Sequence, residues 1–345
     1  MNSPLTTDLR PRTTDHALRR AIGTAAFSLV EILVAIALLS IIALGLFAMF
    51  NQTQRAFRSS MTQTDVLEAG RAVADMLGRE IEQMTPSYRN ATNASAQILD
   101  FYNFKVLPLT QPLPGTALWR TNLLEDFFLL TRQNQTWVGI GYCVRTNDST
   151  GHLWLPETGP ASGQVGVGSL YRFTMTTNLL QGVAPNRGLP ADPGQLLRAF
   201  QTASQPGSTL ISNRVCDGVV HFRFRMFATN GFPIFSDGSR TNAWFYTIQT
   251  NGLLGTSLVR QAATHPNNSY PDRLDACFFW SNSVPAFLEF ELGVLEPRLV
   301  TRYNSIGDPA ARLKYLQDTN LDVSTRVHLF RQRVPVRNVD PLAYQ

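Results

Sequence analysis

Charged side chains are scarce in this sequence of 345 residues, because Asp, Glu, Lys and Arg make up only 16% of it. Soluble proteins usually carry about a quarter. The formal net charge of +5 is spread along the chain, and its densest basic cluster is Arg326, Arg331, Arg333 and Arg337. A nucleic-acid interface needs a basic patch interleaved with aromatic side chains, so this charge pattern does not favour a nucleic-acid partner.

Cysteine is also rare. Cys143, Cys216 and Cys277 lie far apart, which excludes CxxC pairs and the ligand spacing of zinc sites. An oxidising compartment would allow one disulfide and leave one thiol over. The alternative is that all three are small buried side chains. The sequence leaves both interpretations open.

The motifs of common enzyme classes are missing as well. There is no GxSxG, phosphate-binding loop or paired-carboxylate motif, and no segment has the ligand density of a calcium site. Gly166-Val167-Gly168 lacks the helix that follows a phosphate loop, so we interpret it as a bulge or a site of close packing. The histidines are isolated from one another: His16, His152, His221, His265 and His328. We therefore expect no catalytic residues, no metal and no cofactor.

A long apolar run near the N-terminus is the most informative feature that is present. It extends from Leu29 to Phe50, and Glu31 is its only charged residue. As an α-helix it would reach about 33 Å, enough to cross a hydrocarbon core of about 30 Å. Residues 1–26 are polar and basic, with Arg10, Arg12, Arg19 and Arg20. A basic flank stays in the cytoplasm, so we expect the chain after Asn51 on the outer side.

Three interpretations of this run compete. A cleaved secretory signal would have a shorter apolar core followed by small residues, whereas the best such site, Ala43-Leu44-Gly45, lies inside the run. An ordinary signal anchor, as in a plain membrane-anchored binding protein, explains the run but not its single acid. A carboxylate near the edge of a membrane helix is costly and by default has a partner or a purpose. The third interpretation is that the run follows a proteolytic cleavage motif, and it explains both the apolar run and its single acid.

Ala26-Phe27-Ser28-Leu29-Val30-Glu31 resembles the class III cleavage and methylation motif of type IV prepilins. In that family a membrane peptidase cuts on the cytoplasmic side, before the apolar stretch. The residue before the cut is usually Gly, and this chain departs from the pattern with Ala26. The resemblance implies cleavage between Ala26 and Phe27, and N-methylation of Phe27. Glu31 lies one helical turn from Phe27 on the same face, placed to pair with the free amino terminus of its own or a neighbouring subunit.

The fold class that follows is α+β, with a long N-terminal transmembrane helix packed on a β-sheet-rich globular periplasmic domain. The resemblance divides the chain into a cleaved leader (1–26), a transmembrane half-helix (27–50), a periplasmic half-helix (51–86) and a β-rich domain with insertions (87–345). Apolar residues that we expect to dock on the domain recur at steps of mostly three to five: Phe57, Met61, Val66, Ala69, Val73, Met76, Ile81 and Met84. Pro86 is expected to stop the helix, with Thr85 as its last residue.

Period-two alternation predicts the strands of the globular domain. We expect strands at 98–106, 126–131, 137–145, 171–175, 219–227, 286–295 and 326–337, a short helix at 308–318, and loops at 107–116 and 189–194. The two clearest strands carry Arg223 and Arg225, and Glu289 and Glu291, on their polar faces. If these strands are neighbours, the opposite charges contribute about 0.2–1 kcal/mol per pair.

The size of the β-rich region favours a minor, low-copy subunit. Three stretches further resemble the J-type minor pseudopilin of type II secretion: 69–83, 217–224 and 283–292. This resemblance implies an inner-membrane subunit of a pseudopilus tip that primes assembly. Its partners would be other minor and major pseudopilins, the prepilin peptidase and methylase, the assembly platform and the lipid bilayer. The alternative is a minor pilin of a surface type IV pilus that serves adhesion, motility or DNA uptake.

Overall fold

The computed structural model describes residues 28–87, 99–112, 118–134, 136–147, 151, 153–154, 166–177, 194–204, 213–231, 233–234, 261–262, 275–280, 284–317 and 326–339. Within these residues the helices are α1 Leu29–Glu82, α3 Gly194–Ala203, α4 Pro297–Ser305 and α5 Pro309–Gln317. The strands are β1 Leu99–Pro112, β2 Trp119–Gln133, β3 Thr136–Asn147, β4 Leu153–Trp154, β5 Gly168–Thr176, β6 Asn213–Phe227, β7 Pro233–Ile234, β8 Gln261–Ala262, β9 Asp275–Trp280, β10 Phe287–Leu295 and β11 Val327–Pro335. The chain divides into two compact units between Arg58 and Ser59.

The first unit contains the first part of α1. Every residue from Ser28 to Arg58 is exposed, although most of the side chains up to Phe50 are apolar. The helix is long and apolar enough to cross a membrane. Gly45, the only weak helix former in the apolar run, does not interrupt it, because its neighbours on either side are strong helix formers.

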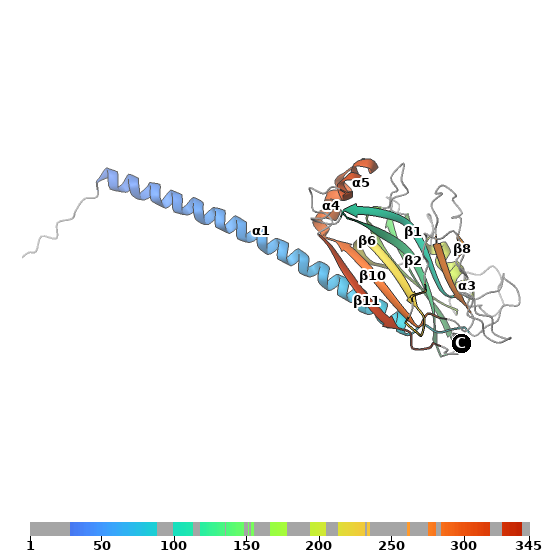
Figure 1. Cartoon of the computed structure of the whole chain (residues 1–345). Coiled ribbons are helices and arrows are strands. Elements are labelled where there is room, and N and C mark those ends of the chain that lie inside the picture. Colours follow the sequence, from blue (N-terminus) through green and yellow to red (C-terminus); the bar gives the residue numbers. More distant parts are fainter. Residues whose placement is uncertain are drawn as a thin grey trace, which may run out of the picture. The chain divides into compact units, whose positions relative to one another are not determined.

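The second unit is built on one large sheet. Its strands follow the order β11-β10-β6-β5-β3-β2-β1-β9-β8, and β4 and β7 pair with β3 and β6. Most neighbours are antiparallel, and Figure 1 shows β11, β10 and β6 side by side. Strand β6 also touches β2 in parallel at Leu124 and Phe222, beyond the end of its pairing with β5. The α+β class predicted from the sequence is confirmed, with a long apolar helix followed by a sheet-rich domain.

Residues Ser59–Glu82 of α1 belong to this second unit and cover one face of the sheet. Their buried positions recur every three or four residues, which is the spacing of one helical face: Val66, Gly70, Val73, Ala74, Leu77, Gly78 and Ile81. Gly70 lies directly against the Phe330 ring of β11, so closely that a Cβ atom would clash with it. The predicted docking stripe is confirmed at Val66, Val73, Ile81 and Met84, and Met76 is half-buried. The prediction was wrong for Phe57, Met61 and Ala69, which are exposed.

Helix α3 lies on the opposite face. Tyr142 points toward α1, and because side chains alternate along a strand, Gly141 faces the other way. A Cβ atom at Gly141 would clash with the Phe200 ring of α3. The central sheet is therefore buried on both faces, and one hydrophobic core contains residues of α1, α3 and the strands between them.

Helices α4 and α5 form a smaller core where β10 ends, and Figure 1 shows them together there. Val220 joins this core because a β-bulge shifts the register of β6 and β10 between Gly293 and Val294. Gly166 lies against Tyr303 of α4, where no side chain would fit. This confirms the interpretation of Gly166 as a site of close packing.

Several predicted boundaries were wrong. The loop expected at 107–116 is in fact the second half of β1 as far as Pro112, with a register shift between Val106 and Pro108 that accommodates the first proline. Helix α1 ends at Glu82 rather than Thr85, because Met84 forms a β-bridge with Thr131.

Two helices were not predicted from the sequence. Gly194, expected in a loop, begins α3, and α4 was also not predicted. The other expected strands, and the helix at 308–318, are confirmed within a few residues, although β2 and β6 start earlier.

Candidate functional site

The first turn of α1 carries the acid that the sequence singles out. Glu31 accepts a hydrogen bond from the backbone N–H of Ser28 at 2.9 Å, and its own N–H donates to Ser28 Oγ at 3.2 Å. This reciprocal arrangement is a capping box, which satisfies two of the N–H groups left open at a helix N-terminus. Ser28 was not predicted as the cap, although its Ser-x-x-Glu spacing to Glu31 is the sequence signal of such a box.

Capping leaves the Glu31 carboxylate available for a further partner. An ionised carboxylate has about four sites for accepting hydrogen bonds, and the Ser28 N–H occupies one of them. The helix dipole also stabilises a negative charge in this first turn. Ala26 and Phe27, the predicted residues of cleavage and methylation, lie outside the described residues, so both roles stay predictions.

A polar contact fixes the other end of α1 on the sheet. Glu80 accepts hydrogen bonds from the Tyr142 hydroxyl of β3 and from Arg172 Nε of β5, the latter at 2.8 Å. Burial, together with the neighbouring Glu80 charge, raises the pKa of the Tyr142 phenol far above its usual range. The phenol therefore stays protonated and donates. Glu80 was not singled out from the sequence, because its partners lie 62 and 92 residues away.

The charged pairs predicted between two strands are present on the face opposite α1. Strands β6 and β10 are neighbours, and their register places Arg223 opposite Glu291 and Arg225 opposite Glu289. Strand β11 adds Arg331 opposite Glu291 and Arg333 opposite Glu289. Two rows of Arg-Glu-Arg thus cross three strands, and we call these six residues the arginine ladder.

The two glutamates of the ladder are buried, contrary to the half-exposed position that the alternation suggests. Glu289 is 7% and Glu291 9% exposed. Arg225 reaches both carboxylates at 3.5 Å, and Arg331 reaches Glu289 at 2.7 Å and Glu291 at 3.5 Å. The flanking arginines compensate for the loss of water around each buried carboxylate.

A buried histidine extends the ladder to β2. The backbone N–H of Leu123 donates to His221 Nδ1 at 3.0 Å, so Nε2 carries the ring proton and faces Glu291 at 3.2 Å. The hydrogen bond from His221 is the main reason why the pKa of Glu291 is lowered, with Arg225 adding to the effect and burial opposing it. His221 thus has two partners and is a structural group of the sheet.

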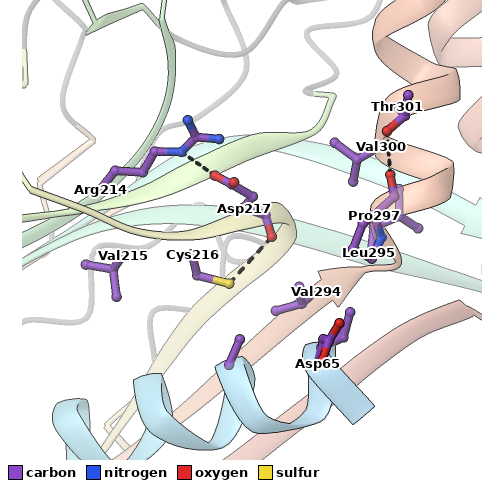
Figure 2. A pocket seen from close by; sticks show the side chains of 12 residues that line it. Asp65, Arg214, Val215, Cys216, Asp217, Val294, Leu295, Pro297, Val300 and Thr301 are labelled. Atoms are coloured by element: carbon purple, nitrogen blue, oxygen red, sulfur yellow. Dashed lines mark hydrogen bonds and ion pairs between the residues drawn. The ribbon is translucent and has the colours of Figure 1, made fainter. Parts of the chain in front are cut away.

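A groove of about 690 Å³ lies within the second unit, between α1, the start of β6, the end of β10 and α4. Figure 2 shows Val215, Val294 and Val300 among its apolar lining residues, and Asp217 bonded to Arg214. The Cys216 thiol also lines it, and burial raises the pKa of this thiol to about 11. A thiol with such a pKa is protonated at neutral pH and is a weak nucleophile.

The cysteines of the described residues are unreactive. Cys143 and Cys216 are both free and buried, and burial raises the pKa of Cys143 to about 12. The side chain of Cys277 lies outside the described part of the chain. Among the described residues, no cluster of His, Cys, Asp and Glu is suited to hold a metal ion.

Comparison of the chain with models of protein families, with curated proteins and with solved structures found no match.

Proposed function

We propose that this chain is a minor pseudopilin, a structural subunit at the tip of a type II secretion pseudopilus. The observation that carries the proposal is Glu31, the single charged residue of the apolar run Leu29–Phe50, in the first turn of a helix long enough to span a membrane. A carboxylate at that depth in lipid requires a cation. The N-terminal amine released by cleavage before Phe27 would supply one within a helical turn.

The second part of α1 supports a role in assembly rather than simple anchoring. From Val66 to Ile81 one face of the helix is buried against the sheet domain, and Glu80 fixes it to two strands. Helix α1 runs without interruption from the apolar run into this packed part. In a filament held together by packed membrane helices, this continuity would join the sheet domain covalently to the filament core.

The weaker similarity to J-type pseudopilins favours secretion over a surface pilus. Two of the stretches that carry it, 217–224 and 283–292, overlap β6 and β10, which are neighbours in the sheet. The alternative, a minor pilin of a type IV pilus, uses the same processing and assembly chemistry. Genes for other minor pseudopilins beside this gene would support the secretion system, whereas genes for pilus retraction would support the alternative.

Mass spectrometry of the mature N-terminus tests the class directly. The full chain is expressed in a bacterium that contains a prepilin peptidase, and a methylated Phe27 is the expected N-terminus. An intact Met1 would refute the proposal. Ala26→Gly restores the residue that is usual in the family before the cut, so this variant is expected to be processed at least as completely.

Two substitutions separate the charge of Glu31 from its capping role. Glu31→Gln keeps a capping box, because Gln serves at this position, but removes the charge. Ser28→Ala removes the capping hydroxyl and keeps the charge. If the charge pairs with an amino terminus, Glu31→Gln abolishes incorporation into filaments while Ser28→Ala largely retains it. Equal losses in both variants would assign Glu31 to helix capping alone.

A further inference from the structure

The arginine ladder ends at the edge of the sheet. Strand β11 pairs with β10 and has no second neighbour among the described strands. Its residues on the ladder face include Leu329, Arg331 and Arg333, all of them exposed. The edge therefore presents two arginines two residues apart, about 7 Å along the strand.

The charges of the ladder are not balanced. It has four arginines and two glutamates, an excess of two positive charges. The carboxylates are shared mainly by Arg225 and Arg331. Arg333 instead lies over the rings of Phe227, at 3.9 Å, and Phe287, at 4.8 Å. No described carboxylate lies within ion-pair distance of Arg333, so the edge strand has a positive charge that none of the described acidic residues pairs.

We infer that the β11 edge binds an extended acidic segment of a partner protein, which adds a strand to the sheet. Carboxylates at alternate positions of that strand would stand opposite Arg331 and Arg333 and continue both rows as Arg-Glu-Arg-acid. Strand addition supplies backbone hydrogen bonds for affinity, and cross-strand pairs supply specificity. The two carboxylates of such a segment would also balance the excess of two positive charges in the arginine ladder. The inference does not depend on the proposed function.

A nucleic acid fits the ladder less well. Nucleic-acid binding proteins commonly contact about six to ten phosphates, whereas the ladder offers four arginines that two buried carboxylates partly neutralise. Charged residues on an edge strand also serve to prevent unwanted pairing between sheets. If the arginines had only this protective role, an acidic strand would not bind to the β11 edge.

The probe is a seven-residue peptide of alternating valine and glutamate, blocked at both ends and labelled with a fluorophore. The protein is the full chain in detergent micelles, and binding is measured by fluorescence anisotropy up to millimolar concentrations. One control peptide carries glutamine in place of glutamate, and a second carries an N-methyl group on every backbone nitrogen, which removes the donors on both edges of the strand. The acidic peptide is expected to bind, and both controls are expected to lose most of the binding.

Two protein variants locate the site. Arg331→Gln and Arg333→Gln are each expected to weaken binding roughly 1.5- to 5-fold, the range for one cross-strand charge pair. Arg298→Gln removes an exposed arginine on α4 and is expected to change nothing. Circular dichroism checks that each variant stays folded. Because Arg333 contacts two rings and Arg331 pairs with both buried carboxylates, the comparison of the acidic and glutamine peptides on the unchanged protein decides the case if either variant unfolds.

Three outcomes would overturn the inference. The first is no binding at millimolar peptide, which would leave the arginines with a protective role. The second is equal binding of a control peptide: equal binding of the glutamine peptide would show that charge pairing is not needed, and equal binding of the N-methyl peptide would show that strand addition is not needed. The third is a single-stranded DNA oligonucleotide that binds more tightly than the peptide and loses affinity with Arg331→Gln, which would identify a surface for polyanions.

Discussion

From Leu29 to Arg58, α1 exposes every side chain, whereas from Ser59 to Glu82 the same helix buries one stripe in the sheet domain. The first part is apolar on all sides up to Phe50, and the second alternates apolar with charged positions. A helix that is apolar all round needs lipid or other helices around it, whereas a helix with one apolar stripe needs a single partner surface. The chain itself supplies that surface only for the second part.

Because of this difference, the two parts of α1 contribute differently to the stability of the sheet domain. Side chains of the second part fill space between the helix and the strands, so their removal leaves cavities. Side chains of the first part are exposed, so their removal leaves no cavity in the sheet domain. Matched substitutions in the two parts should therefore have different effects on the unfolding of the sheet domain.

The largest expected effect comes from Leu77→Ala. Leu77 is 0% exposed, and its truncation should lower the free energy of unfolding by about 2–5 kcal/mol, from lost burial and a residual cavity. The matched substitution Leu38→Ala, at a residue 56% exposed, should change it by less than about 0.5 kcal/mol. Urea unfolding of the full chain in detergent, followed by tryptophan fluorescence, measures both. Similar losses in both variants would contradict the division of the helix.

A smaller effect is expected from added volume at two glycines of α1, Gly70 and Gly45. At Gly70 a methyl group would clash with the Phe330 ring, so Gly70→Ala should destabilise the domain by about 1–3 kcal/mol. At Gly45 no atom lies within 4 Å of such a methyl group. Gly45→Ala should therefore leave the unfolding of the sheet domain unchanged. A neutral Gly70→Ala would mean that the Phe330 ring can move aside.

Much of this fold is predictable from local pattern. The apolar run that begins at Leu29 predicts the long helix. Period-two alternation predicts β6, β10 and β11, and it places opposite charges on β6 and β10. The predictions that were wrong concern segments whose structure depends on residues far away in the sequence. Pro108 and Pro112 suggest a loop, yet they lie in a strand because β2 pairs with that segment and a register shift accommodates the first proline. Helices α3 and α4 are short, so tertiary packing decides them more than intrinsic propensity.

The candidate sites also differ in whether nearby or distant residues define them. Glu31 and its capping partner Ser28 are three residues apart, so the sequence alone reveals them. Glu80, in contrast, is recognisable as an anchor only when β3 and β5 bring Tyr142 and Arg172 to it. The burial of Glu289 and Glu291 was also unpredictable from alternation. Alternation identifies the two faces of a strand but does not show whether neighbouring side chains cover the second face.

The smallest expected effect concerns pH and the buried ladder. His221 holds the pKa of Glu291 below its usual range, so the unfolded state takes up a proton at a higher pH than the folded state. The stabilisation is therefore full above the unfolded pKa and is lost as the pH falls through the folded pKa. Glu291→Gln should flatten this acid dependence, measured by urea unfolding from neutral pH to about pH 3. Glu68→Gln, at an exposed position of α1, is the control, and an identical acid profile in both variants would mean that Glu291 contributes nothing.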